Sequence, residues 1–280
     1  MKSYNQAPLP FMGQKRKFIK DFKAALKQYP ENAIYVDLFG GSGLLSHTVK
    51  QCYPDATVIY NDYDNYTQRI NAIPHTNKLI ADLRTILQDH PRSKRITGRH
   101  REEVLSRIEK EKGFVDYITI SSSILFSMKY ATDFEQLKKQ ALYNRVNAGV
   151  YNADGYLQGV QVICCDYKKL AQQFKGKENV VYLVDPPYLS TESTTYSSNG
   201  YWKLSDYLDV LDVLHHPKYF YFTSNKSSIV ELCEWMGTRS NFDNPFKNAV
   251  QKNVYTTMNY NSSYTDMMLF RYVQNDTLTK

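Results

Sequence analysis

The chain of 280 residues holds 35 lysines and arginines against 28 aspartates and glutamates, which gives a formal net charge of +7 at pH 7. This length fits one large α/β domain with a smaller insertion, and the basic balance favours a polyanionic partner. Residues 1–10 lack an apolar stretch, and no apolar run elsewhere is long enough to span a membrane. We therefore expect no signal peptide, no membrane segment and a cytoplasmic site of action.

A glycine-rich turn follows the first apolar run. Residues 33–36 predict a buried strand, which runs into Asp37-Leu38-Phe39-Gly40-Gly41-Ser42-Gly43 and then into a helix expected at 44–53. This order is typical of nucleotide sites in open α/β sheets, where ligands bind beyond the carboxyl ends of the strands. Glycine lets the backbone approach a ligand where a Cβ atom would collide. The Lys-Ser/Thr pair of phosphate-binding loops and the glycine spacing of dinucleotide folds are both absent, so neither site is expected.

A second strand is expected at 56–60, and it ends at Asn61-Asp62. Asp62 lies about 20 positions further on, where an acid accepts hydrogen bonds from ribose hydroxyls. The next apolar run begins only after about ninety residues, far more than the dozen or so that a simple crossover needs. We therefore predict an inserted subdomain at 67–158.

Two segments of this insertion have compositions suited to DNA contact. Residues 92–101 concentrate cations around turn residues and would track phosphates, although a solvated loop and helix face is the alternative. Residues 144–155 are rich in turn formers and in amides that read base edges, although an ordinary tight loop has the same composition. Helices are expected at 114–128 and 136–145. The DNA-binding candidates are Arg92, Lys94, Arg95, Arg99, Arg101, Asn144, Arg145, Asn147 and Asn152.

A third strand is expected at 161–165, directly ahead of Asp166. Its two cysteines lie inside an apolar run, which predicts buried thiols. No pair of cysteines has the Cys-x-x-Cys spacing of a zinc site, and adjacent cysteines do not readily share one tetrahedral metal. We expect free thiols and no metal. The cysteines are Cys52, Cys164, Cys165 and Cys233.

The apolar run 180–184 predicts a buried strand, and it ends in Asp185-Pro186-Pro187-Tyr188. The strand would carry the carboxylate out at the sheet edge, while the prolines fix φ at about −65° and remove two backbone donors. The turn then presents carbonyl acceptors to an exocyclic amine, and the tyrosine ring offers a stacking face. The alternative is that Asp-Pro-Pro only ends the strand and begins a loop, without a chemical role.

Polar residues 191–202 follow this motif, and their length and position suit a lid that orders when DNA binds. Residues 274–280 are expected to form a frayed tail. The remaining expected elements are a strand at 219–225, a helix at 227–236, a strand at 252–260 and a last strand at 266–272.

These motifs, in this order, resemble a known family. The Asp-x-Phe-x-Gly-x-Gly turn at 37–43, a following strand that ends in an acid, and Asp-Pro-Pro-Tyr at 185–188 together resemble the DNA adenine-N6 methyltransferases, which include the bacterial Dam enzymes. Residues 10–17 are similar to that family's opening segment. The resemblance implies an α/β fold with a Rossmann-like methyltransferase sheet, mostly parallel with an antiparallel terminal strand. It also implies a smaller, inserted, largely helical DNA-recognition subdomain.

The implied reaction moves a methyl group from S-adenosylmethionine to the exocyclic N6 of an adenine that is flipped out of a specific double-stranded DNA sequence. The catalytic domain would comprise residues 1–66 and 159–280. Target recognition would belong to residues 67–158. The family is compatible with a bacterial or phage origin and with a companion restriction endonuclease, as in restriction-modification systems.

The resemblance also assigns site residues. Asp185 and the Pro186 carbonyl would accept hydrogen bonds from the amine, while Tyr188 stacks on the base. An aspartate after a strand is also a common helix N-cap, which leaves that alternative open for Asp62 and Asp166. The implied catalytic residues are Asp185, Pro186, Pro187 and Tyr188. The implied cofactor-binding residues are Met12, Gly13, Gln14, Lys15, Asp37, Phe39, Gly40, Gly41, Ser42, Gly43, Asp62, Asp166 and Asp185.

Other functions fit parts of the same pattern. One alternative is methylation of cytosine N4, an exocyclic amine whose lone pair is likewise delocalised into the ring and which the same tetrapeptide could activate. The opening segment and the order of the motifs disfavour this alternative. Cytosine-C5 methylation needs a cysteine nucleophile, and none of the four cysteines stands next to a proline. A catalytically idle DNA-binding module is disfavoured because all the required motif residues are present, while charge alone leaves RNA open as the substrate.

Overall fold

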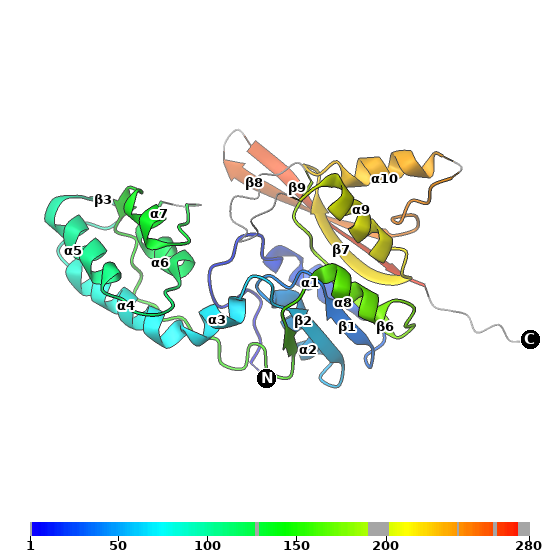
Figure 1. The fold of residues 1–280 in the computed structure, drawn as a ribbon, viewed down its shortest axis with the longest axis horizontal. Helices are drawn as coiled ribbons and strands as arrows, with labels where there is room; N and C mark the ends of the chain where they lie inside the picture. The colour runs from blue at the N-terminus through cyan, green and yellow to red at the C-terminus, as the bar shows by residue number, and fades with distance from the viewer. Residues whose placement is uncertain (1, 127–128, 190–201, 240, 260–261, 274–280) are drawn as a thin grey trace, which may run out of the picture. The chain divides into compact units, whose positions relative to one another are not determined.

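The computed structural model describes residues 2–126, 129–189, 202–239, 241–259 and 262–273. The chain divides into two compact units (Figure 1). The first unit comprises Met1–Gln6, Gln14–Asp64 and Leu157–Lys280, and the second comprises Ala7–Gly13 and Asn65–Tyr156. The expected lid at 191–202, apart from Trp202, and the expected tail at 274–280 lie outside the described residues.

A sheet of seven strands forms the centre of the first unit, counted over the described residues. The strands are β1 Ile34–Asp37, β2 Thr57–Asn61, β5 Gln161–Ile163, β6 Val180–Val184, β7 Lys218–Ser224, β8 Val250–Asn259 and β9 Ser262–Tyr272. Their order in the sheet is β5-β2-β1-β6-β7-β9-β8. The first five strands of this order are parallel, whereas β9 is antiparallel to both β7 and β8. This confirms the α/β sheet, mostly parallel with an antiparallel terminal strand, that the sequence predicts.

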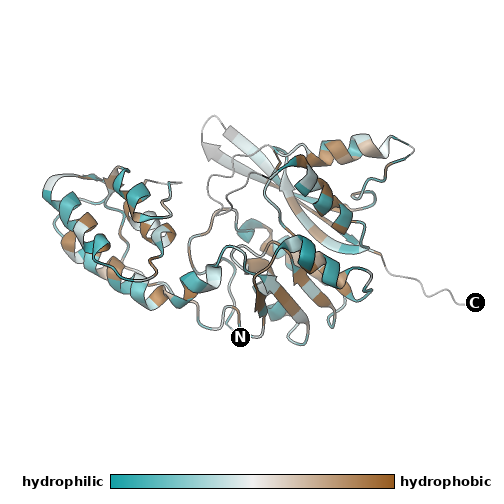
Figure 2. Ribbon diagram, in the orientation of Figure 1, coloured by the Kyte–Doolittle hydropathy of each residue, from teal (hydrophilic) through white to brown (hydrophobic). Residues whose placement is uncertain are grey.

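Helices cover both faces of this sheet. All five residues of β6 are buried, as in a strand that is covered on both sides. Leu183 packs with α1 and α2 on one face, while Tyr182 and Val184 pack with α8, α9 and α10 on the other, because successive side chains alternate between faces. Figure 2 shows the hydrophobic colour along the central strands. The helices are η1 Arg16–Phe18, α1 Ile19–Leu26, α2 Leu44–Cys52, α8 Tyr167–Phe174, α9 Leu204–Val213 and α10 Ile229–Gly237.

The second unit is largely helical, as the sequence predicts, and it has a hydrophobic core of its own that includes Leu83, Val104 and Ile120. It comprises residues 7–13 and 65–156, whereas the insertion was expected at 67–158. Its role in target recognition remains a prediction. Its elements are α3 Tyr66–Asn71, α4 Ile73–Ile86, β3 Arg95–Ile96, α5 Gly98–Glu109, α6 Tyr117–Ile124, α7 Phe134–Lys138 and β4 Leu142–Tyr143.

Two helices of this unit are shorter than the sequence predicts. The helix expected at 136–145 ends as α7 at Lys138, and β4 then pairs antiparallel with β3. The backbone of Asn144 extends this ladder by donating to the Lys94 carbonyl at 3.0 Å and accepting from Ser93 at 2.7 Å. The helix expected at 114–128 is reduced to α6, whose N-cap is Asp116.

The prediction of buried thiols at Cys164 and Cys165 is wrong. Cys164 is exposed and Cys165 is half-buried, because β5 is the edge strand of the sheet and also exposes Val162. All four cysteines are free, as predicted. No helix in the described part of the chain is long and apolar enough to cross a membrane.

Candidate active site

The two principal motifs leave the sheet at the same edge. Strands β1 and β6 are parallel neighbours, with Asp37 beside Leu183 in register. The Leu38 amide also donates to the Leu183 carbonyl at 3.0 Å. Because both strands run in the same direction, the glycine turn after β1 and the Asp-Pro-Pro-Tyr turn after β6 begin side by side.

The glycine turn is tight, and its geometry requires glycine. The Gly43 amide donates to the Gly40 carbonyl at 2.7 Å, and Gly41 and Gly43 have φ values of 49° and 71°. A Cβ atom on Gly40 would collide with the Tyr60 ring. The Tyr60 hydroxyl lies 2.7 Å from the Gly41 carbonyl oxygen and 2.9 Å from an Asp62 carboxylate oxygen. Tyr60 therefore connects the turn with Asp62, a role that the sequence did not reveal.

Asp37 is a fully buried carboxylate with an unsatisfied oxygen. Its Oδ2 atom accepts a hydrogen bond from Ser46 Oγ at 2.7 Å, whereas Oδ1 has no hydrogen-bond partner among the described residues. Burial raises the pKa of Asp37 to about 7, and the charge of Asp185 adds to the increase, while hydrogen bonds from the Ser46 side chain and from the backbone of Phe39 and Ser46 oppose it. The site therefore has a strong acceptor in need of a cationic or hydrogen-bond-donating ligand.

Asn61 holds three strand ends together at this edge. Its Nδ2 atom donates to the Leu38 carbonyl at 3.0 Å and to the Cys165 carbonyl at 2.9 Å, and its Oδ1 atom accepts from the Cys165 amide at 3.0 Å. The segments that follow β1, β2 and β5 are thereby fixed to one another. The polar residue directly after an apolar run was the available signal, but its three partners are far away in sequence.

The two further acids predicted to bind the cofactor differ in environment. Asp62 is buried, and its amide donates to the Ile163 carbonyl at 2.7 Å. Asp166 is exposed, and its carboxylate caps α8 by accepting from the Lys168 amide at 2.7 Å. The N-cap alternative therefore holds for Asp166, and its contact with a cofactor stays a prediction.

Lys15 pairs with the carboxylate of the Asp-Pro-Pro-Tyr turn. Its Nζ atom lies 2.6 Å from Asp185 Oδ2, and the two side chains are only 9% and 18% exposed. The same nitrogen lies 5.5 Å from the centre of the Tyr188 ring. Burial raises the pKa of Asp185, while the charge of Lys15 and its hydrogen bond lower it. Lys15 therefore favours the ionised form of a carboxylate that burial would otherwise neutralise.

No role at this edge was predicted from the sequence for Asp266, Tyr167 or Trp202. Asp266 on β9 interacts with both Lys15 and Tyr188. Phe39 packs against Tyr167 and Trp202, with ring centres 4.8 and 5.6 Å away. Within the described residues, no group of three or more His, Cys, Asp or Glu side chains is arranged to hold a metal ion.

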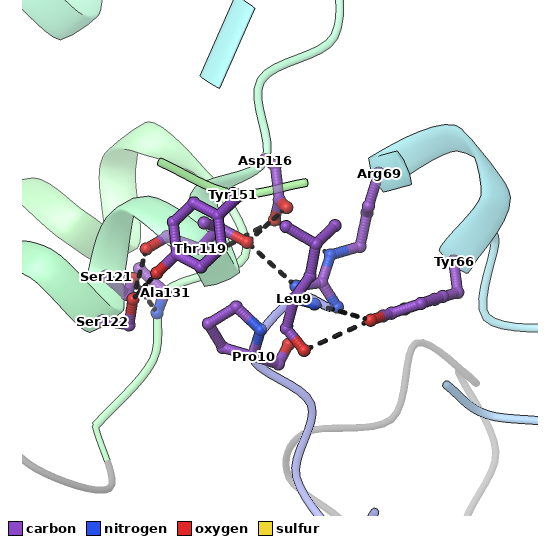
Figure 3. Close-up of polar contacts among 10 residues, drawn as sticks. All are labelled: Leu9, Pro10, Tyr66, Arg69, Asp116, Thr119, Ser121, Ser122, Ala131 and Tyr151. Carbon is purple, nitrogen blue, oxygen red and sulfur yellow. Dashed lines mark hydrogen bonds and ion pairs between the residues drawn. The ribbon is translucent and has the colours of Figure 1, made fainter. Parts of the chain in front are cut away.

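The N-terminal segment carries predicted cofactor residues in both units. Met12 and Gly13 belong to the second unit, whereas the first unit resumes at Gln14. Within the second unit, Arg69 donates to the Pro10 carbonyl at 2.7 Å, and the Tyr66 hydroxyl lies 3.0 Å from the Leu9 amide nitrogen (Figure 3). This part of the segment is thus held by α3.

Several DNA-binding candidates stabilise the second unit itself. Asn144 is buried, and its Nδ2 atom donates to the His90 carbonyl at 2.7 Å, so its side chain is not presented to a base. Arg92 donates to the Val146 carbonyl and to Asn147 Oδ1. Arg101 donates to the Lys138 carbonyl at 2.6 Å.

The remaining candidates include the exposed Lys94, Arg95 and Arg99. Arg99 pairs with Glu103 one turn along α5 at 2.7 Å but is 87% exposed. Arg145 donates from its backbone to the Ser123 carbonyl, and Asn152 forms a local turn with Asp154. Lys94, Arg95 and Arg99 are therefore exposed cations of the candidate set, in which Arg92, Asn147 and Asn152 are exposed as well.

A family model described as D12 class N6 adenine-specific DNA methyltransferase matches residues 11–256. A Haemophilus influenzae protein with the provisional name of a methyltransferase is 36% identical over 279 residues, which cover 97% of this chain and 94% of that protein. A solved SAM-dependent methyltransferase from Agrobacterium tumefaciens has 12% identity and a TM-score of 0.41, with 91% of this chain and 61% of that chain covered. An rRNA methylase from Streptococcus thermophilus has 9% identity and a TM-score of 0.37, with 94% and 100% covered.

Proposed function

We infer the function from one premise, which is that the chain belongs to the D12 class N6 adenine-specific DNA methyltransferases. It is an enzyme that methylates N6 of adenine with S-adenosylmethionine as the methyl donor. We propose further that the adenine lies in a specific sequence of duplex DNA and is flipped out of the helix for the reaction. We also propose that the enzyme acts in the cytoplasm, whereas a companion endonuclease stays a prediction of the sequence.

The residues around the glycine turn fit the methyl donor. S-adenosylmethionine supplies a methyl group on a positively charged sulfur, and it also carries an ammonium group. The unsatisfied Oδ1 atom of Asp37 is an acceptor that suits such a cation, and a cation there would lower the pKa of Asp37 again. We propose that Asp37 and the turn of Gly40 to Gly43 hold the amino-acid part of the donor, and that Asp62 holds its ribose.

Asp185 is proposed to accept a hydrogen bond from the adenine amine. The lone pair of this nitrogen is delocalised into the ring, which makes the amine a poor nucleophile. An acceptor that takes a hydrogen bond from its N–H group makes the lone pair more available and stabilises the positive charge that develops on the nitrogen. Only the ionised carboxylate accepts in this way without competing as a donor. The ion pair with Lys15 at 2.6 Å lowers the pKa of Asp185 against the effect of burial and so favours that form, and it is the observation that carries the proposal.

Tyr188 is proposed to stack on the flipped base. Flipping costs a few kcal/mol, and stacking on an aromatic ring contributes about 1–3 kcal/mol per base, so the two are of similar size. The exposed cations Lys94, Arg95 and Arg99 of the second unit are proposed to contact DNA phosphates. The net charge of +7 supports a polyanionic substrate.

One experiment tests the substrate, the product and the sequence specificity together. The protein is incubated with labelled donor and with duplex DNA of mixed sequence, and matched single-stranded DNA and RNA serve as controls. The DNA is then digested to nucleosides and the modified positions are mapped. We expect N6-methyladenine at one short sequence in the duplex. N4-methylcytosine as the product, or faster transfer to RNA, would contradict the proposal.

A further inference from the structure

The terminal antiparallel strand brings a third carboxylate to the edge where the parallel strands end. Asp266 on β9 is in register with Ser224, the last residue of β7, and with Val254 on β8. Because β9 runs opposite to β7, the beginning of β9 lies where β7 ends. Strand β7 is also the neighbour of β6, which ends directly before Asp185.

The partners of Asp266 connect it with the proposed catalytic residues. Its carboxylate accepts a hydrogen bond from the Tyr188 hydroxyl and one from Thr256 Oγ1, the latter at 3.2 Å. Thr256 in turn accepts a hydrogen bond from Lys17 Nζ at 2.9 Å. The charge of Lys15, which pairs with Asp185, also acts on Asp266.

Two contacts therefore fix the tyrosine of the Asp-Pro-Pro-Tyr turn. The Lys15 ammonium lies over the face of the Tyr188 ring, with 5.5 Å between Nζ and the ring centre. Asp266 holds the hydroxyl at the far end of the same ring. A ring held at both its face and its tip cannot rotate freely about χ1, so the conformational freedom it would lose on stacking is already removed.

We propose that Asp266 is a positioning residue for methyl transfer, which acts by holding the Tyr188 ring in the orientation that receives the target base. This inference rests on the proposed function, because it needs Tyr188 to stack on that base. Asp266 touches neither the base nor the donor in this proposal. Its second effect is electrostatic, since its negative charge, like burial, disfavours the ionised form of nearby Asp185.

The test is a double-mutant cycle with Asp266→Asn and Tyr188→Phe. Tyr188→Phe removes the donor of this hydrogen bond, whereas Asp266→Asn replaces its charged acceptor with a weaker, neutral amide oxygen, and both changes leave the ring in place. We expect each single variant to lower kcat/KM for DNA by about ten-fold, the size associated with one hydrogen bond to a charged group. The double variant should be no slower than the slower single variant, because the bond can be lost only once. Asp212→Asn and Tyr255→Phe, at two exposed positions, are the matched controls and should keep wild-type activity.

Two further readouts separate positioning from a general loss of structure. Fluorescence of 2-aminopurine at the target position should still rise when either single variant binds DNA, but to a lower plateau than with the wild type. Removing the charge of Asp266 should also shift the acid limb of the kcat/KM profile to lower pH, because Asp266 raises the pKa of Asp185 while Lys15 lowers it. Tyr188→Phe keeps that charge and should leave the limb in place.

The outcomes distinguish this inference from the function on which it rests. If the wild-type enzyme neither methylates adenine nor raises the 2-aminopurine signal, the proposed function fails. If the wild type does both, but Tyr188→Phe has wild-type activity or the two changes multiply in the double variant, the positioning role of Asp266 alone is wrong. Should Asp266→Asn fail to fold, Tyr188→Phe still decides, because it removes the same bond from the other side.

Discussion

A buried polar network in the second unit contrasts with the acids at the sheet edge of the first unit. In the second unit, the carboxylate of Asp116 accepts hydrogen bonds from Arg69 Nε at 3.0 Å and from both the amide and the hydroxyl of Thr119 (Figure 3). Arg69 also donates a hydrogen bond to the Pro10 carbonyl. At the sheet edge of the first unit, Asp37 Oδ1 has no partner among the described residues, and burial raises the pKa of Asp37, Asp185 and Asp266.

This difference separates a structural network from a binding site. Buried polar groups that satisfy one another fix a fold, as the Arg69 network fixes the N-terminal segment. At the sheet edge, the Lys15 ammonium acts on both Asp185 and Asp266, whereas Asp37 keeps a buried carboxylate oxygen without a partner among the described residues. Acids with such raised pKa values concentrate at functional sites. The cationic methyl donor would provide the partner for Asp37.

Asp185→Ala should nearly abolish methyl transfer. Loss of the proposed acceptor removes stabilisation that is needed only as charge develops, so we expect kcat to fall by at least about a thousand-fold. Folding and donor binding should be retained, as measured by thermal melting and calorimetry. Asp209→Ala removes a carboxylate on the surface of α9 and should leave the rate unchanged. Retained transfer to duplex DNA by the Asp185 variant would refute the assigned role.

Asp116→Ala should affect stability rather than chemistry. It leaves the buried Arg69 guanidinium without its counter-ion, for which we expect a loss of about 3–5 kcal/mol in the free energy of unfolding. The control is Asp133→Ala, which removes the exposed N-cap of α7 and should cost about 1 kcal/mol. Denaturant unfolding measures both. Equal losses would show that the Arg69 network is not the closed structural unit described above.

Asp37→Asn should weaken donor binding by about ten-fold and change how stability depends on pH. The folded state raises the pKa of Asp37 from its ordinary 3.8 to about 7, so folded Asp37 binds its proton more tightly than unfolded Asp37. This contribution to stability is complete below the unfolded pKa and is lost as the pH rises to about 7. In thermal melts without the methyl donor, the melting temperature of the variant should therefore rise relative to that of the wild type as the pH increases across this range. Parallel curves would contradict the assignment.

Arg99→Ala should have the smallest effect. If Arg99 contacts a phosphate, the variant binds all duplex sequences somewhat less tightly, and the slope of log K against log salt decreases by about 1. Lys20→Ala, at an exposed position on α1 of the first unit, is the control with the same charge change. An unchanged slope, measured by fluorescence anisotropy at several salt concentrations, would exclude Arg99 from the interface.

The central strands and both site motifs were predictable because their signals are local. The apolar runs before Asp37 and Asp185 are buried on both faces of a parallel sheet, so they read as continuous hydrophobic segments. Parallel strands also place their carboxyl ends at one edge, which brought the glycine turn and the Asp-Pro-Pro-Tyr turn together. In the second unit, the two-residue strand β4 is too short to show any periodicity.

The rest depends on partners that are distant in sequence. Asn61 was recognised only as part of the end of a strand, yet it binds the segment after β5, about a hundred positions away. Asp266 was regarded as the first residue of a strand, and only the antiparallel pairing of β9 with β7 brings it to the active edge. Cys164 was expected inside because its run is apolar, but an edge strand leaves part of such a run exposed.

The central claim is that a cation from the methyl donor satisfies Asp37. With a pKa of about 7, Asp37 is about half protonated at pH 7, and binding of a cation beside it must release that proton. Calorimetric titration of S-adenosylmethionine at pH 7, in buffers of different ionisation enthalpy, measures the release directly. The account predicts that the wild type releases a substantial fraction of a proton and that Asp37→Asn releases markedly less. Equal release by the two proteins, or none by the wild type, would contradict it.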